Sequence, residues 1–111
     1  MGKGNDKKVV REARHLLLSA LGNLLESDRE RKFRRPHQKQ RPLSRDEFCA
    51  QKHLPDTNVS FIETGRFLDL DFAHLRLYLA NTYGKSDVAF VTSVKKVYDG
   101  LKELDKLLKK L

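Results

Sequence analysis

The sequence predicts an all-α fold of five helices in a single domain spanning residues 1–111. Apolar residues recur at spacings of three and four along most of the chain, which is the period of an amphipathic helix. Residues 88–92 are rich in β-branched side chains, but the same spacing continues through them, so we expect no strand. A chain of this length buries roughly two thirds of its surface, enough for a core without disulfides or metal.

The first expected element is a long N-terminal helix over residues 6–33, capped by Asn5 or Asp6. Leu18 widens its apolar stripe, so we expect the helix to be covered on more than one side. Gly22 lies within the stripe, and a glycine inside a helix costs about 1 kcal/mol relative to alanine. It marks either a close packing contact or a break.

A basic segment follows at residues 34–42, with no apolar residue except Pro36 and Pro42. Because proline breaks helices and restricts the preceding residue, we predict an exposed loop or arm. The chain holds 23 Lys and Arg against 15 Asp and Glu, a net charge of +8, and its densest basic stretch runs from residue 29 to 41. Such a concentration suggests a polyanionic partner, most often nucleic acid.

Shorter helices are predicted in the rest of the chain. Ser44 followed by Glu47 has the spacing of a capping box, which starts a helix. Gly65 supplies a residue that tolerates the left-handed conformation at a helix end. The expected elements are helices at 43–53, from 55 or 56 to 63, at 71–84 and at 87–111, with a loop at 66–70.

Two short helices joined by a tight turn form a helix-turn-helix arrangement, here residues 43–65. The segments LSRDEFC (43–49) and VSFIETG (59–65) resemble the lambda-repressor-like helix-turn-helix family, also called the Cro or xenobiotic-response-element family. The resemblance covers about residues 18–85, and His53 and Leu54 stand where the family commonly has glycine. It implies a lambda-repressor-like domain of five helices, with an extended N-terminal helix and a C-terminal dimerisation helix.

The second helix of such a unit enters the major groove and reads bases with polar side chains near its start. By resemblance, the base-reading positions are Asp56, Thr57, Asn58, Ser60 and Phe61. Asn58 can pair bidentately with adenine, and Thr57 and Phe61 can contact a thymine methyl. We expect Val59 and Ile62 to face inward.

The basic arm is expected to supply affinity without sequence choice, because each neutralised phosphate releases counterions. The expected DNA-backbone contacts are Arg34, Arg35, Lys39 and Arg41 of the arm, Ser44 and Arg66, and, by resemblance, Arg45. The alternative is a solvated arm that contacts nothing.

The C-terminal helix carries a heptad-like seam. Its members are Phe90, Val94, Val97, Leu101, Leu104 and Leu108. We expect this seam to form a homodimer interface, since DNA binders of this kind are two-fold dimers. Two alternatives stay open: the seam packs on its own domain, or the N-terminal helix forms the dimer.

Other classes of function find little support. The four histidines lack the spacing of a zinc site, Cys49 suits a core position, and no glycine-rich phosphate loop is present. We therefore expect no catalytic site, no metal and no cofactor. No apolar run approaches the ~20 residues needed to cross a bilayer, and no apolar leader is evident. With a single cysteine, the sequence favours a reducing, cytoplasmic compartment, associated with a prokaryotic, plasmid or phage nucleoid.

The leading hypothesis is a sequence-specific regulator that binds double-stranded DNA, a homodimeric repressor that reads an inverted repeat. One alternative is a protein-interaction adaptor that keeps the same fold, because Asp56 and Phe61 also suit a protein surface. Another is a non-specific nucleic-acid binder that uses only the arm.

Overall fold

The computed structural model describes residues 3–84 and 88–110, and these form five α-helices and a two-stranded sheet. The helical part of the prediction is confirmed, with each described helix boundary within three residues of the expected one. The elements are α1 (Lys3–Lys32), β1 (Arg34–Arg35), β2 (Gln38–Pro42), α2 (Arg45–Lys52), α3 (Asp56–Glu63), the 3-10 turn η1 (Phe67–Asp69), α4 (Phe72–Tyr83) and α5 (Val88–Lys110).

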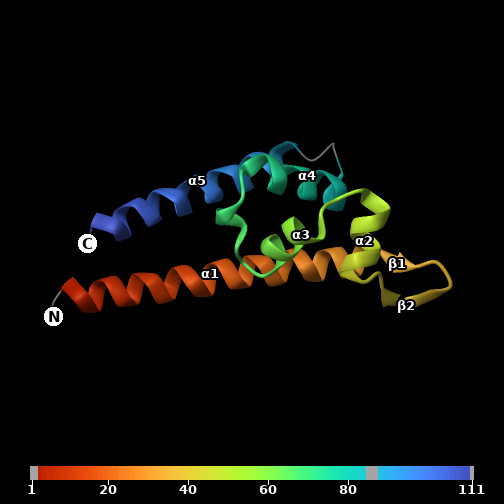
Figure 1. Cartoon of the computed structure of the whole chain (residues 1–111), viewed down its shortest axis with the longest axis horizontal. Coiled ribbons are helices and arrows are strands. Elements are labelled where there is room, and N and C mark those ends of the chain that lie inside the picture. The colour runs from red at the N-terminus through yellow and green to blue at the C-terminus, as the bar shows by residue number, and fades with distance from the viewer. Residues whose placement is uncertain (1–2, 85–87, 111) are drawn as a thin grey trace.

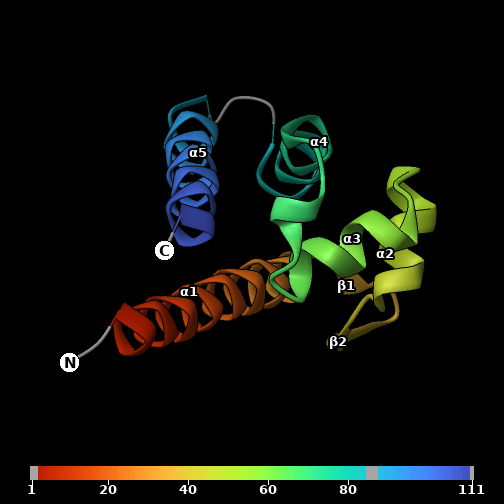
Figure 2. The ribbon, with the colours of Figure 1, turned by 60° about the vertical axis from the view of Figure 1, so that its left-hand side comes forward.

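Helix α1 runs along the whole length of an elongated molecule with extents of 57 × 26 × 21 Å (Figure 1). Helices α2 and α3 lie against its C-terminal half. Helix α5 returns in the opposite direction, so both ends of the chain lie at the same end of the molecule. The view in Figure 2 shows that the axes of α1 and α5 diverge. A side-chain ion pair between Arg14 and Asp105 joins these two helices.

The core lies where α1, α3, α4 and α5 meet, and it gathers most of the buried apolar side chains into one cluster. Val59 and Ile62 belong to it, so the predicted inner face of α3 is confirmed. Cys49 belongs to it as well, and burial raises the pKa of its thiol to about 12. The remaining cluster members are Leu18, Leu25, Phe48, Leu54, Phe67, Leu68, Leu75, Tyr78, Leu79, Tyr98 and Leu101.

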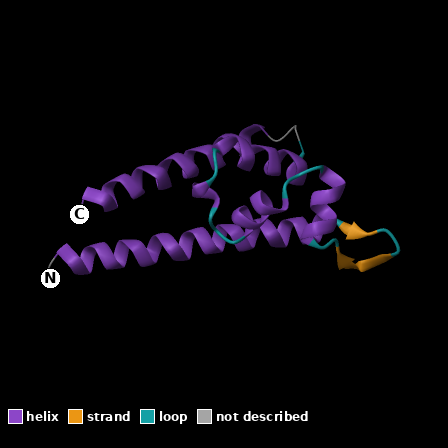
Figure 3. Ribbon diagram, in the orientation of Figure 1, coloured by secondary structure: helices purple, strands orange, loops and turns teal. Residues whose placement is uncertain are grey.

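The basic segment 34–42 is exposed, but it is a β-hairpin, so the expected loop and the absence of strands were wrong (Figure 3). Strands β1 and β2 are antiparallel, with Arg34 opposite Pro42 and Arg35 opposite Gln38. Below the strands, the Leu43 amide donates to the Phe33 carbonyl at 2.9 Å and closes the base. Pairing satisfies the backbone groups of polar residues that have no apolar face to bury. The predicted loop 66–70 likewise contains η1.

The heptad-like seam of α5 packs largely within its own chain, as in the alternative to a dimer interface that the sequence left open. Leu101 and Leu108 are buried. Phe90, Val94 and Leu104 pack against the core. Val97 is 44% exposed. Heptad spacing requires a partner helix, but it does not say whether that helix belongs to the same chain. Here α1 and α4 supply the partner surface.

Gly22 marks a close crossing of α1 with the end of α3, not a break in α1. A Cβ atom at Gly22 would lie 2.7 Å from the Glu63 carbonyl oxygen and 2.7 Å from the Gly65 nitrogen. Gly65 has φ +81°, and its own Cβ would lie 2.7 Å from the Leu18 carbonyl oxygen. Only glycine fits at both positions, and the two glycines let the two backbones touch.

Replacing Gly22 with alanine is therefore expected to destabilise the fold, by about 1–3 kcal/mol, the usual cost of overpacking. Gly100 is the matched control, because it is also helical and a Cβ there meets nothing within 4 Å. Gly100→Ala should stabilise the protein by about 0.4–1 kcal/mol. Urea unfolding of both variants measures the two changes, and equal effects would contradict the close crossing.

Candidate nucleic-acid interface

Helix α2 begins at the predicted capping box, and the hairpin is fastened to it there. The Glu47 amide donates to Ser44 Oγ at 3.1 Å, and the Ser44 amide donates to Glu47 Oε1 at 3.1 Å. Arg35 donates to the same carboxylate oxygen at 2.9 Å. The hydrogen bonds from Ser44 and the charge of Arg35 lower the pKa of Glu47. The basic hairpin is thus held beside the first turn of α2.

Residues 53–55 join α2 to α3 without a glycine. His53 takes the left-handed conformation itself, with φ 56° and ψ 43°. The Leu54 amide then donates to the Cys49 carbonyl at 3.0 Å, and the Leu54 side chain is buried. Pro55 precedes the first residue of α3 and presets an extended backbone. A non-glycine residue in this region is uncommon and carries a modest conformational cost.

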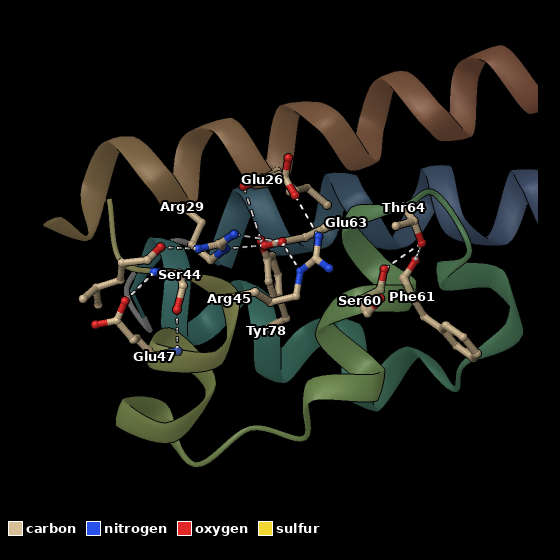
Figure 4. A network of polar contacts seen from close by, with 12 residues as sticks. Glu26, Arg29, Ser44, Arg45, Glu47, Ser60, Phe61, Glu63, Thr64 and Tyr78 are labelled. Atoms are coloured by element: carbon tan, nitrogen blue, oxygen red, sulfur yellow. Dashed lines mark hydrogen bonds and ion pairs between the residues drawn. The ribbon is translucent and has the colours of Figure 1, made fainter. Parts of the chain in front are cut away.

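The C-terminal end of α3 is held by a buried carboxylate, that of Glu63 (Figure 4). Arg29 of α1 donates to it through Nε at 2.5 Å and through Nη2 at 3.0 Å. Arg45 Nε of α2 donates to Oε1 at 3.0 Å, and the Tyr78 hydroxyl of α4 donates to Oε2 at 2.6 Å. One carboxylate therefore ties α3 to three other helices.

The partners of Glu63 keep it charged although no solvent reaches its side chain. Burial alone would raise the pKa of Glu63. The hydrogen bonds from Arg29 and Tyr78 and the positive charge of Arg29 outweigh burial and lower the pKa below its usual value. Burial, together with the negative charge of Glu63, raises the pKa of Tyr78, so this hydroxyl remains a donor.

Arg45, predicted as a DNA contact, is part of this network. Besides Glu63, its guanidinium donates to Glu26 Oε2 at 2.8 Å. The side chain is half-buried between the two carboxylates. Two of its donor nitrogens, Nε and Nη2, are therefore engaged within the protein, and the guanidinium joins α2 to α1 and α3. The side chain is 31% exposed, and its contact with phosphate stays a prediction.

The five predicted base-reading residues lie on α3 outside its buried set, which is Val59, Ile62 and Glu63. Asp56 and Thr57 are exposed, and Asn58, Ser60 and Phe61 are half-buried. Asn58 Nδ2 lies 3.2 Å from His74 Nδ1, within hydrogen-bond distance. Phe61 points away from Glu63 in Figure 4, and its ring centre lies 4.4 Å from the guanidinium carbon of Arg66. This side of α3 thus offers amide, hydroxyl and aromatic groups.

The predicted backbone contacts differ in how far their side chains are engaged. Arg34 and Arg41 are exposed in the hairpin, and Arg34 Nη1 donates to the Gln40 carbonyl at 3.4 Å. Arg35 is paired with Glu47, and the Ser44 hydroxyl is engaged in the cap. Arg66 is exposed, and its Nε lies 3.7 Å from Asp69 Oδ2. The side chain of Lys39 lies outside the described part of the structure.

Sequence reasoning missed the Arg29–Glu63 pair, although a signal was present. Arg29 continues the inward stripe of Leu18, Gly22 and Leu25 at spacings of four and three, and Glu63 lies four residues after Val59. A charged residue on an inward stripe indicates a buried ion pair. His74, the partner of Asn58, gives no such signal, because it lies on the exposed side of α4.

Comparison of the chain with protein-family models, curated proteins and solved structures found no match. Within residues 3–84 and 88–110, no helix is both long and apolar enough to cross a membrane. Over the same residues, no three His, Cys, Asp or Glu side chains gather as a metal site would require.

We expect Glu63→Gln to lower the free energy of unfolding by about 3–5 kcal/mol, because it leaves Arg29 charged and buried without its counter-charge. The matched control is Glu103→Gln on the exposed pair with Lys106, for which we expect about 0–1 kcal/mol. Urea unfolding at pH 7 measures both. Equal losses of unfolding free energy in the two variants would show that the buried pair matters no more than the exposed one.

Because of the same carboxylate, we expect the stability of the fold to be sensitive to acid. The pKa of Glu63 is lower in the folded chain than in the unfolded chain, where it is about 4.3. Its stabilisation is therefore complete above pH ~4.3 and is lost as the pH falls through the folded pKa. Unfolding curves at stepwise lower pH should show this loss in the native chain and a smaller one in Glu63→Gln.

Proposed function

We propose that this chain binds duplex DNA, with α2 and α3 as a helix-turn-helix unit and α3 as the helix presented to the major groove. The observation that carries the proposal is the two-sided character of α3. Its inner side is held by Glu63, and outside that side Thr57 is exposed and Asn58 and Ser60 are half-buried. Short polar side chains near the start of a helix suit contact with base edges.

Rigid placement of α3 supports this assignment. Reading bases requires side chains held to within about 0.5 Å, and a site on a fixed helix meets this better than one on a loop. The Glu63 network and the backbone crossing at Gly22 both restrain the inner side of α3. The outer residues can then be presented in one orientation.

In this proposal, the basic hairpin contacts the DNA backbone. Arg34 and Arg41 are exposed on it, and the Arg35–Glu47 pair keeps it beside the start of α2. Arginine on an exposed hairpin can neutralise phosphates or enter a narrow minor groove. We therefore propose that the hairpin supplies affinity while residues 56–61 supply sequence choice.

The regulatory role we propose is that of a homodimeric repressor. Two copies would occupy an inverted-repeat operator with half-sites about 34 Å apart, one turn of the duplex. Occupancy of a promoter then excludes polymerase. This role requires no catalytic group.

Selection of bound sequences from a random duplex pool at near-physiological salt tests the proposal. We expect an inverted-repeat motif to be enriched. Asn58→Ala should then weaken binding at one base-pair position by about 1–3 kcal/mol, the value of a bidentate amide–adenine contact. The matched control is Asn81→Ala, where the amide bonds within α4. Loss of affinity without loss of preference at any position would contradict base reading by Asn58.

The hairpin is tested by salt dependence. Replacing Arg34 and Arg41 with alanine should weaken binding to every duplex and lower the slope of log affinity against log salt by about 0.9 per lost contact. Arg11→Ala, at an exposed position of α1 distant from the hairpin, is the matched control. An unchanged slope in the double variant would remove the hairpin from the interface.

A second candidate function is a protein-interaction adaptor. It is favoured by the half-buried Phe61 ring stacked with Arg66, because aromatic and arginine side chains dominate protein–protein contacts. The exposed carboxylate of Asp56 at the start of α3 also suits a protein better than DNA. Failure of any duplex to be retained in the selection would favour this candidate.

A further inference from the structure

Helix α1 carries a second apolar stripe that the chain itself leaves uncovered. Val9 is 64% exposed, Leu16 68%, Leu17 46% and Leu24 56%, and Ala13 and Ala20 are exposed between them. These six residues, the α1 outer stripe, span about 22 Å of helix. Monomeric proteins rarely expose a continuous apolar surface of this extent without using it.

The α1 outer stripe is symmetric about its own midpoint. Its members occur in pairs equidistant from the point between Leu16 and Leu17, with Ala13 matched to Ala20 and Val9 matched to Leu24. At about 100° per residue, all six fall within about 50° of one direction. No charged residue between positions 9 and 24 falls on that face.

We propose that the α1 outer stripe binds the same stripe of a second copy, with the two α1 helices antiparallel. In this arrangement, Leu16 lies beside Leu17 of the second copy, Ala13 beside its Ala20, and Val9 beside its Leu24. A two-fold interface must be self-complementary in this way, because each contact occurs twice. Binding to a different protein would not require this symmetry, so the pattern favours a second copy of the chain as the partner.

The shape of the stripe also suits close helix pairing. Alanine beside alanine lets two helix axes approach to the lower end of the usual 8–10 Å, while leucines fill the centre. Leu24 also borders an apolar groove between α1 and α5, which Phe90 and Val97 line. At about 100° per residue, Gly22 lies on the opposite side of α1 from the stripe, so pairing leaves the contact with α3 intact.

This inference names the interface of the homodimer proposed above. It rests on that proposal only for the use of the dimer, because assembly can be measured without nucleic acid. A monomeric chain that still enriches a DNA motif would overturn the interface alone. A dimer with the expected register that retains no DNA would overturn the proposed function alone.

Sedimentation equilibrium of the full chain without DNA gives the first test. We expect a dimer at micromolar concentration. Leu17→Glu should raise the dimer dissociation constant by about 100-fold or more, because two unpaired carboxylates would be buried per dimer. Leu77→Glu on α4 is the matched control, since the exposed fraction of Leu77, 49%, is similar to the 46% of Leu17. A monomeric native chain, or equal effects of the two variants, would overturn the proposal.

Disulfide trapping tests the antiparallel register. Ala13→Cys and Ala20→Cys are made in separate chains and then mixed under mild oxidation. The buried, protonated Cys49 does not compete. In the antiparallel register, the two copies of residue 13 are about 10 Å apart along the axis, beyond the ~7 Å limit for a disulfide. We expect cross-links only in the mixture. Cross-linking of either variant alone, or no cross-linking in the mixture, would overturn the proposal.

Discussion

The buried carboxylate of Glu63 is the interaction on which the arrangement of the helices depends. Removing a carboxylate and a guanidinium from water costs several kcal/mol for each ion, so such a pair is tolerated only when its hydrogen bonds are made. Here Arg29, Arg45 and Tyr78 all donate to it, one from each neighbouring helix. Few other placements of α3 would satisfy all three donors. The network therefore specifies position more than it adds stability.

The same network divides the charges of the chain into structural and available ones. Arg29 and Arg45 belong to the basic total of the sequence, but both are directed at Glu63. Arg35 is held by Glu47. The count of 23 Lys and Arg therefore overstates the basic groups that a polyanion would meet, whereas the net charge of +8 already includes the paired glutamates. Arg34 and Arg41 of the hairpin and Arg66 after α3 are exposed, so their charges are available to an interface.

Local chemistry predicted much of this structure, and tertiary contacts decided the rest. Apolar spacing placed the helices, and Ser44 with Glu47 placed the start of α2. The hairpin at 34–42 has no alternating apolar pattern, since its strands form through backbone pairing of polar residues. An inward charge at Glu63 can be seen in the sequence, but its partners on three other helices cannot. The buried side of α3 was predicted, whereas the ion pairs of Arg45 were not, because they depend on Glu26 and Glu63.

The two stripes of α1 connect the fold to the proposed function. One stripe packs on the core and on α5, so the heptad-like seam of α5 is largely covered within the chain. The other stripe is left for a second copy. In the proposed dimer, the two Gly22 crossings are about 16 Å apart along the helix axis, and three successive helix packings separate the two α3 helices by about 24–30 Å across it. These components combine to about 29–34 Å. The duplex repeats its major groove every ~34 Å, so pairing through α1 would set two copies of α3 at nearly the spacing of successive half-sites.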